Sequence, residues 1–343
     1  MASSTSETGN DSSAPQLLPI LCLLGVVSLL SSITPAMKYV FQHSALNFLD
    51  VACGRVLIGF AFLALVTGYL DWRGLRGLRV SECVPLAAVG LLGVGAYAAA
   101  AWGLQYTSAT HYALVYSLLP TFTAVFSFFL RNDRTTPLTW LGILISWLGC
   151  LLGIANGITV STIEFGFGDG LALLFTAMMS AHIVLSTRIV RRHGVLVSNT
   201  AMFGTSALML SLGTAAWGAA PQGREVTWDV AAAVLYVGLG TACVFLLRTR
   251  ALQSLTPATV GAYHNLIPIC MIVLAHLFLG EAITSQTLAG GLAVVLGTEM
   301  VRKAPYLMPC TLWLNERVNA ITLPSLALNR IRVYGRSGRH VDQ

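Results

Sequence analysis

Long apolar runs separated by short polar gaps dominate this chain, and ten such runs can be marked. Each is close to the length of about 20 residues that a helix needs to cross the hydrocarbon core of a bilayer. The first five runs are Leu17–Met37, Leu46–Leu70, Val84–Leu104, Ala109–Leu130 and Leu138–Asn156. The second five are Gly170–Ile189, Val195–Trp217, Val230–Leu247, Ala258–Leu279 and Thr287–Val301. The pattern predicts an all-α integral membrane protein with ten transmembrane helices, in which neighbouring helices run antiparallel.

Composition supports this prediction. The chain has 343 residues, of which 55% are hydrophobic and only 10% charged, and its mean hydropathy is +0.73. A soluble domain carries roughly a quarter of charged residues to solvate its surface, so lipid must cover much of this protein. The net charge of +6 resides in the gaps and in the C-terminal segment. This distribution indicates membrane topology and not a nucleic-acid partner.

Arginine and lysine concentrate in every second gap. The basic positions are Arg73, Arg76, Arg79, Arg131, Arg134, Arg188, Arg191, Arg192, Arg248, Arg250, Arg302 and Lys303, followed by the basic C-terminal segment. The opposite gaps hold only Arg224, apart from Lys38 at the end of the first run. By the positive-inside rule this alternation predicts ten spans with both termini in the cytoplasm. A plasma (inner) membrane is the expected location.

An internal repeat divides the apolar part of the chain. A shift of 148 residues places the fourth and fifth runs on the ninth and tenth without a gap, matching Pro120 with Pro268 and Asp133 with Glu281. Five spans per repeat is an odd number, so the two halves must enter the membrane from opposite sides, as in many transporters. The sequence therefore predicts a disordered tail at 1–16, five-helix repeats at 17–157 and 158–301, and a basic cytoplasmic tail at 302–343.

Particular segments resemble a known family. The stretches GLQYTSATHYALVYSLLPTFTAVFSFFL and RALQSLTPATVGAYHNLIPICMIVLAHLFLGEAITSQTLAGGLAVVLG resemble the ends of two EamA-type repeats of the drug/metabolite transporter superfamily. Ser31–Lys38 and Ser180–Arg188 resemble the family's first repeat helix, which ends in a basic residue, and Phe278–Glu281 is the most specific match. The resemblance implies a ten-helix inverted-repeat fold. It also implies a central cavity lined mainly by helices 1, 3, 4, 6, 8 and 9, and export of amino acids, other small metabolites or drugs.

Polar aromatic residues in the fourth and ninth runs are the leading candidates for that cavity. His111, Tyr112 and Tyr116 lie in the fourth run, and the repeat relates Val115 and Tyr116 to Tyr263 and His264 in the ninth. Both sets precede a mid-run proline, Pro120 or Pro268, which is expected to kink the helix. The alternative is that these side chains only form hydrogen bonds between helices.

Charged residues inside a membrane are costly and are functional candidates by default. Arg55 lies about nine residues into the second run, roughly 13 Å along a helix. It is either part of a structural ion pair or a group that attracts a substrate carboxylate or couples a proton. Lys38 is a further cavity candidate; the alternative is an ion pair with Asp50 near the outer face.

Other polar residues have structural explanations. Asp133 and Glu281 are expected to cap helix N-termini, and Glu299 is expected to pair with Arg302. His182 is a cavity candidate, but His182 and His276 are isolated histidines, which more often pack against a neighbour than bind a metal. The seven cysteines show no metal or disulfide pattern, so neither a metal nor a cofactor is expected. Gly149, Gly153 and Gly157 indicate helix packing, within the chain or in a homodimer.

Together these features predict a secondary transporter, a monomer or homodimer, that exports small zwitterionic or anionic metabolites by alternating access. No Walker motif is visible in the sequence, so the energy would come from the substrate gradient or from a coupled ion such as a proton. The alternatives are an intramembrane enzyme and a membrane receptor or scaffold. Neither requires the pseudosymmetric repeat, and no catalytic serine, aspartate or metal motif lies in the runs.

Overall fold

The computed structural model describes residues 17–131, 135–155, 166–217, 226–254 and 263–307, and all regular structure in these ranges is α-helical. The first half contains α1 (Leu17–His43), α2 (Phe48–Leu70), α3 (Trp72–Arg76), α4 (Val80–Tyr106), α5 (Ala109–Tyr116), α6 (Leu119–Arg131) and α7 (Pro137–Ile154). The second half contains α8 (Phe167–His193), α9 (Val195–Trp217), α10 (Trp228–Ser254), α12 (Leu266–Leu279) and α13 (Ser285–Leu307). The all-α class predicted from the sequence is therefore confirmed.

The first three long helices of the two halves have equal lengths. Helices α1 and α8 each have 27 residues, α2 and α9 each have 23, and α4 and α10 each have 27. The first residues of these pairs are offset by 150, 147 and 148 residues respectively. The repeat predicted from the last two runs of each half therefore extends through the helices that precede them.

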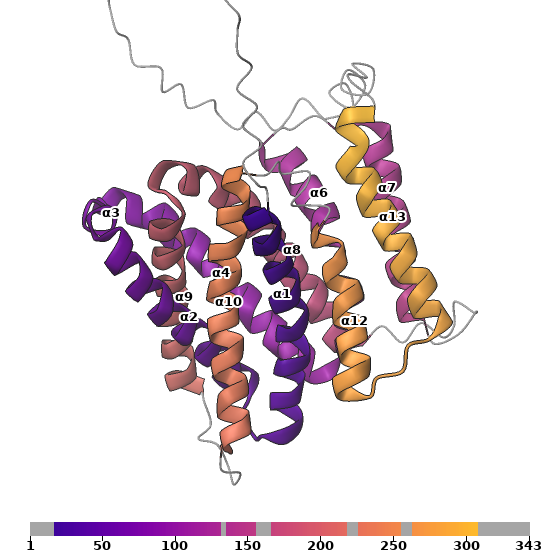
Figure 1. The fold of residues 1–343 in the computed structure, drawn as a ribbon, viewed down its shortest axis with the longest axis horizontal. Coiled ribbons are helices and arrows are strands. Elements are labelled where there is room, and N and C mark those ends of the chain that lie inside the picture. The colour runs from indigo at the N-terminus through magenta and orange to yellow at the C-terminus, as the bar shows by residue number, and fades with distance from the viewer. Residues whose placement is uncertain (1–16, 132–134, 156–165, 218–225, 255–262, 308–343) are drawn as a thin grey trace, which may run out of the picture.

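The packing of the helices follows the same relationship. Helix α1 packs against α10 and α12, as α8 packs against α4 and α6, and α2 packs against α10 as α9 packs against α4. Helices α7 and α13 pair with each other along one edge of the bundle (Figure 1). The main buried cluster lies where the halves meet and includes Val56, Ala100 and Leu114 from the first half and Ile267 from the second. Each repeat thus packs mostly against its partner.

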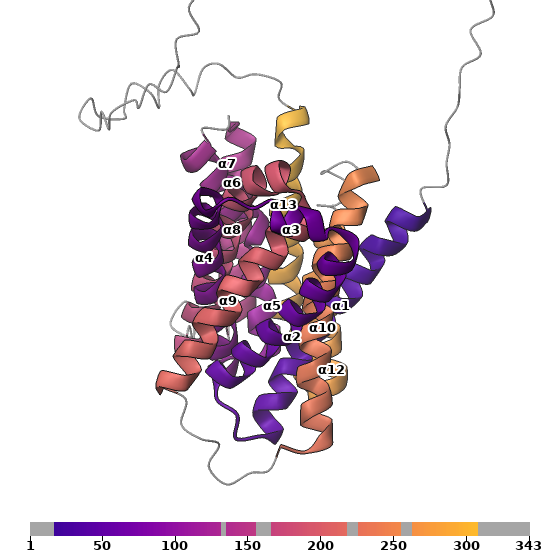
Figure 2. The same cartoon turned by 90° about the vertical axis from the view of Figure 1, so that its left-hand side faces the viewer.

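One end of the bundle collects the basic helix ends. The start of α1, the short helix α3 and the ends of α6, α8, α10 and α13 lie at the upper end in Figures 1 and 2. The predicted basic gaps fall at these points in the chain. The α1–α2 and α12–α13 connections lie at the opposite end (Figure 1). The alternation of charge along the sequence is thus an asymmetry between the two ends of the molecule.

Local sequence sets the helix boundaries. Asn47 starts α2 with a capping box, in which its side chain accepts from the Asp50 N–H at 2.9 Å and the Asp50 carboxylate accepts from the Asn47 N–H at 3.0 Å. The alternative of an Asp50–Lys38 pair is not formed, because Lys38 Nζ donates to the carbonyl oxygens of Leu104 and Thr107 instead. Thr136 caps α7, whose first residue is Pro137. Helix α12 ends at Gly280, which has a φ of 69°, a left-handed conformation that suits glycine.

Glycines allow α7 and α13 to pack closely. A Cβ on Gly149 would lie 2.8 Å from the Gly290 carbonyl oxygen, and one on Gly142 would lie 2.6 Å from that of Gly297. Such close approach is typical of membrane helices, where small residues replace the hydrophobic drive for association. Gly149 and Gly153 therefore serve packing within the chain, the first of the two roles expected for this run. Gly157 lies outside the described residues.

The helices differ from the predicted runs in the number of spans and in two local features. Eight described stretches are long and apolar enough to cross a membrane, and α12 is a shorter apolar helix. Length and composition alone therefore do not give the predicted ten spans. The fourth run consists of two helices, α5 and α6, separated at Ser117 and Leu118, so Pro120 stands in the first turn of a new helix. Pro268 occupies the corresponding part of α12. Helix α3 was not predicted.

Candidate functional site

A cavity lies where the two repeats meet. Its walls come from α1, α2, α4, α5, α6, α8, α10 and α12, and about 60 Å³ of it is open to the centres of water molecules. This is room for several waters or for part of a small solute, since one water needs roughly 10–15 Å³ by this measure. The six helices implied by the family resemblance all contribute. Helix α2 adds one residue to the lining, Arg55.

Arg55 is buried in the wall of this cavity, with 8% of its surface exposed. Its Nε donates to Oγ1 of Thr241 on α10 at 2.9 Å, and its Nη1 lies 3.5 Å from the sulfur of Met37 on α1. The guanidinium carbon stands 5.0 Å from the centroid of the Tyr97 ring on α4. No acid among the described residues pairs with it, so the structural ion pair considered for Arg55 is not formed in this part of the chain.

A second arginine lines the same cavity from the other repeat. Arg248, near the end of α10, stands with its guanidinium carbon 4.9 Å from the centroid of the Phe245 ring. The phenols of Tyr97 and Tyr116 lie within electrostatic range of both Arg55 and Arg248. The described lining residues include no aspartate or glutamate. The cavity is therefore electrically positive.

Aromatic rings form one wall. Phe175 of α8 stacks on both Tyr112 and Tyr116, at centroid distances of 5.7 and 6.0 Å and interplanar angles of 20° and 12°. The two tyrosines are four residues apart on α5 and so share one helical face. All three rings line the cavity. Such a wall offers flat apolar contact, with hydroxyl groups at the tyrosine ends.

A smaller pocket, of about 10 Å³ by the same measure, adjoins the first. Tyr116 and His264, which the 148-residue shift relates, both line it, and so do Pro120 and Pro268. Tyr116 lines the large cavity as well. The fold thus brings the repeat-related aromatic pair and both prolines to one place. Whether these residues contact a substrate stays a prediction.

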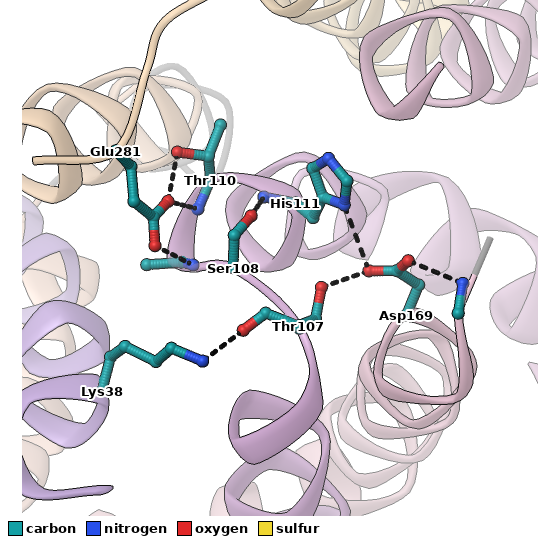
Figure 3. A network of polar contacts seen from close by, with 9 residues as sticks. Lys38, Thr107, Ser108, Thr110, His111, Asp169 and Glu281 are labelled. Carbon is teal, nitrogen blue, oxygen red and sulfur yellow. Dashed lines mark hydrogen bonds and ion pairs between the residues drawn. The ribbon is translucent and has the colours of Figure 1, made fainter. Parts of the chain in front are cut away.

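A polar network lies at the end of the bundle opposite the start of α1 and the end of α13 (Figure 1), and Figure 3 shows its side chains. The Glu281 carboxylate, between α12 and α13, accepts from Ala109 N–H at 2.7 Å, Thr110 N–H at 2.8 Å and Thr110 Oγ1 at 2.6 Å. Lys38 Nζ donates to the carbonyl oxygens of Leu104 at 2.9 Å and Thr107 at 2.7 Å. The Glu281 carboxylate therefore binds the N-terminus of α5, and the Lys38 ammonium binds the C-terminus of α4. Each charge is the one that the helix dipole favours at that end.

Asp169 extends this network to α8. Its carboxylate, in a residue only 3% exposed, accepts from the Thr107 hydroxyl and from the Gly166 N–H at 3.0 Å. The His111 Nδ1 lies 3.6 Å from the same carboxylate. Helices α1, α4, α5 and α8 and the α12–α13 connection therefore meet at one point, beyond Leu104 in the cavity wall.

Several sequence candidates lie away from the described cavity lining. Lys38 and His111 belong to the network just described. The ring Nδ1 of His182 lies 3.1 Å from the Val89 carbonyl oxygen and so joins α8 to α4. Tyr263 packs against the main buried cluster and against a smaller cluster from α1 and α10. A substrate contact by these four residues stays a prediction.

The structure agrees with the role expected for Glu299 and only in part with that expected for Glu281. Glu299 pairs with Arg302, as predicted, and also accepts from Asn265 Nδ2 at 2.7 Å. Glu281 does cap a helix N-terminus, but that of α5 in the other repeat and not that of its own helix α13, which Thr284 caps. The prediction for Asp133 falls outside the described residues.

Sequence reasoning missed three residues of the site. Arg248 was counted as part of a basic gap, since it stands at the end of an apolar run. Thr241 and Asp169 carried no signal of their own, because a single threonine in a span and an acid in the first turn of a helix are common. For Arg248, the run of apolar residues that extends to Leu247 could have suggested a position within the membrane.

Comparison with known proteins gives concordant results. The profile of the EamA-like transporter family matches residues 17–154 and 166–302. The "Uncharacterized transporter YyaM" of Bacillus subtilis (strain 168) is 23% identical over 230 residues, which cover 65% of this chain and 75% of that protein. A solved crystal structure superposes with a TM-score of 0.58 at 18% identity, over 84% of this chain and 98% of that one. At that identity the superposition supports the fold alone.

Proposed function

Because the chain belongs to the EamA-like transporter family, we propose that it is a secondary transporter that exports small metabolites, such as amino acids or related zwitterionic or anionic compounds, by alternating access. The observation that carries this proposal is the cavity between the two repeats, with the buried cation Arg55 in its wall. An intramembrane cation is expensive, and a binding site for a solute gives it a role.

The proposed topology has ten spans. Helices α12 and α13 supply the ninth and tenth, since they follow the same order as the α5–α6 pair and α7 in the first repeat. The basic helix ends at the upper end of the bundle support a cytoplasmic location for both termini. The proposed location is the plasma (inner) membrane. The network of Lys38, Asp169 and Glu281 would then lie at the outer end.

The network is the proposed outer gate. It links elements of both repeats through helix-end contacts, which can be broken without unfolding a helix. In the described state these contacts join α4, α5 and α8 at that end, beyond the cavity. Alternating access requires that they separate when the cavity opens outward, as one repeat rocks against the other. The pair of the buried Asp169 and the partly exposed His111, beside Lys38 and Glu281, is the proposed site for a coupled proton.

Flux of solutes through reconstituted protein tests the proposal. Purified protein in liposomes would be offered a panel of labelled amino acids, organic acids and amines, with protein-free liposomes as the reference. The proposal predicts that members of the panel enter faster than in the reference and leave chemically unchanged. Entry at the reference rate for the whole panel would contradict a transporter, and chemical conversion of a compound would favour the alternative of an intramembrane enzyme. Binding without entry would favour a receptor or scaffold.

A further inference from the structure

The charge of the cavity narrows the class of substrate. The large cavity carries two guanidinium groups, from Arg55 and Arg248, and the described part of its wall contains no carboxylate. Arg55 is 8% exposed, and its polar contacts among the described residues are the Thr241 hydroxyl and the Met37 sulfur. A guanidinium has more N–H donors than these contacts use. Buried cations are normally paired with an anion, so the remaining donors call for an anionic ligand.

The same wall disfavours an ammonium group. An ammonium needs acceptors and gains most from a nearby carboxylate. Besides the arginines, the side-chain oxygen and nitrogen groups of the described lining residues are the hydroxyls of three tyrosines and two threonines. Thr241 already accepts from Arg55 and donates to the Val237 carbonyl at 2.7 Å, so it is committed. Two like charges in a partly desolvated cavity would repel a third cation.

The remaining wall suits a flat or branched apolar body. The Tyr112–Phe175–Tyr116 stack lies on one side. Aliphatic side chains from α1, α8, α10 and α12 fill much of the rest, among them Ile33 and Met271. Tyrosine hydroxyls at the edges of the stack can donate to an anion as well as accept. The walls thus provide donors and apolar surface, but no charged acceptor.

We propose that the cavity selects organic anions that carry a carboxylate and an aromatic or branched apolar body but no ammonium group, with Arg55 as the receptor of the carboxylate and Arg248 as a second attracting cation. This inference rests on the proposed function and narrows its substrate class from zwitterions and anions to anions. Arg55 provides the specificity, because an Arg fork bonded on one side to Thr241 is held in place to bind a carboxylate.

A matched series of ligands tests the inference on the unmodified protein. 3-Phenylpropionate carries the carboxylate alone, phenylalanine adds the ammonium, phenethylamine has the ammonium alone, and 3-phenylpropionamide is neutral. Binding to purified protein would be measured by calorimetry at fixed pH. 3-Phenylpropionate should bind at least about tenfold more tightly than phenylalanine, and phenethylamine should bind most weakly, because a site of polar donors rejects ligands that leave them unpaired. Equal or tighter binding of phenylalanine, or no binding of any member, would overturn the inference.

Variants of the two cavity arginines test which side chain causes the preference for a carboxylate. Arg55→Gln should weaken 3-phenylpropionate binding by about tenfold or more while leaving the weak binding of the neutral amide unchanged, and Arg55→Lys should restore part of the affinity. Arg248→Gln should show a smaller loss of the same sign. Arg76→Gln is the matched control, because Arg76 stacks on Trp72 in the surface helix α3, away from the cavity. An equal loss for the acid and the amide in both cavity variants would contradict a role in charge recognition.

The two proposals fail separately. If 3-phenylpropionate binds with the expected preference but neither it nor any member of the panel crosses liposomes, the proposed transport is wrong and the ligand class of the site stands. If solutes cross but phenylalanine or phenethylamine is preferred to 3-phenylpropionate, transport stands and the anion preference is wrong. The ligand series needs no variant, so a variant that fails to fold leaves the test intact.

Discussion

Arg55 of α2 donates a hydrogen bond of 2.9 Å to the hydroxyl of Thr241 on α10, and so connects the two repeats inside the central cavity. The Thr241 hydroxyl in turn donates to the Val237 carbonyl of its own helix at 2.7 Å. The acceptor that holds Arg55 is therefore itself fixed. This arrangement makes the direction of the guanidinium depend on how the two repeats are docked.

Removal of the Thr241 hydroxyl should loosen Arg55. Thr241→Val keeps the shape of the side chain but removes the acceptor. We expect the KM for an anionic substrate to rise by about threefold to tenfold, less than for the loss of a direct hydrogen bond to a charged group, because Thr241 acts on the substrate only through Arg55. Thr241→Ser should restore most of the affinity. Transport kinetics of the three proteins provide the measurement. An unchanged KM in the valine variant would show that Thr241 does not position Arg55.

The proposed outer gate should open when the Glu281 carboxylate is neutralised. Glu281→Gln keeps the shape of the side chain but weakens its contacts with Ala109 and Thr110, because hydrogen bonds to a charged group are the stronger ones. A cysteine at Leu104, in a background without native cysteines, should then react about tenfold faster with an impermeant thiol reagent added outside.

Glu82→Gln is the matched control for this change. Glu82, near the N-terminal end of α4, pairs with Arg192, near the C-terminal end of α8, at 2.9 Å. The network lies at the opposite end of both helices. The Glu82→Gln substitution should leave the labelling rate of the cysteine at position 104 unchanged or lower that rate. Equal labelling in the Glu281 variant and the parent protein would show that the network does not close this end.

The repeat-related pair Tyr116 and His264 should be reachable from water. Cysteine at either position should react with a small water-soluble thiol reagent, because both residues line pockets and stand close to broken helices, which membranes tolerate where protein or water supplies partners. A transported substrate should slow the reaction at Tyr116, which borders both pockets. Cysteine at Leu148, an outward-facing residue of α7 that is 57% exposed, serves as the lipid-facing control. Labelling no faster than this control would remove both positions from the proposed path.

Close packing of α7 and α13 should be sensitive to a single methyl group. Gly290→Ala places a Cβ against the backbone of Gly149 and Gly153, and overpacking of this kind costs about 1–3 kcal/mol. We expect a lower midpoint of thermal unfolding in detergent. Gly213→Ala on α9 is the control, since a Cβ there meets nothing within 4 Å. Equal midpoints for the two variants would contradict the packing described for this helix pair.

The sequence was most informative where lipid and the backbone impose a strict requirement. Long apolar runs are required to cross a bilayer, and the match of Pro120 to Pro268 follows from the internal repeat; the helices agree with both. The alternation of arginine corresponds to the basic helix ends at one end of the bundle. The broken fourth run was less accessible, because a proline alone does not distinguish a kink from a new helix. The end of α4 was also misplaced by the hydropathy pattern, since Gln105 and Tyr106 are polar but remain helical.

The candidate site was only partly predictable for a different reason. Arg55, Tyr112 and Tyr116 stood out as polar groups in apolar runs, and they line the cavity. Most partners of Lys38 and Glu281 are backbone groups at the end of α4 and the start of α5. Backbone partners leave no mark on residue type, so these contacts emerge only when the helices are assembled.

Solute counterflow tests the central claim, alternating access through the cavity, most directly. Liposomes containing the protein would be loaded with unlabelled 3-phenylpropionate, or with the best substrate of the panel, and diluted into a trace of the labelled compound. A carrier that exposes one site to each side in turn predicts a transient accumulation of label inside above its equilibrium level, which is lost in Arg55→Gln and retained in Arg76→Gln. Label that rises only to equilibrium, or no faster than in protein-free liposomes, would contradict the account.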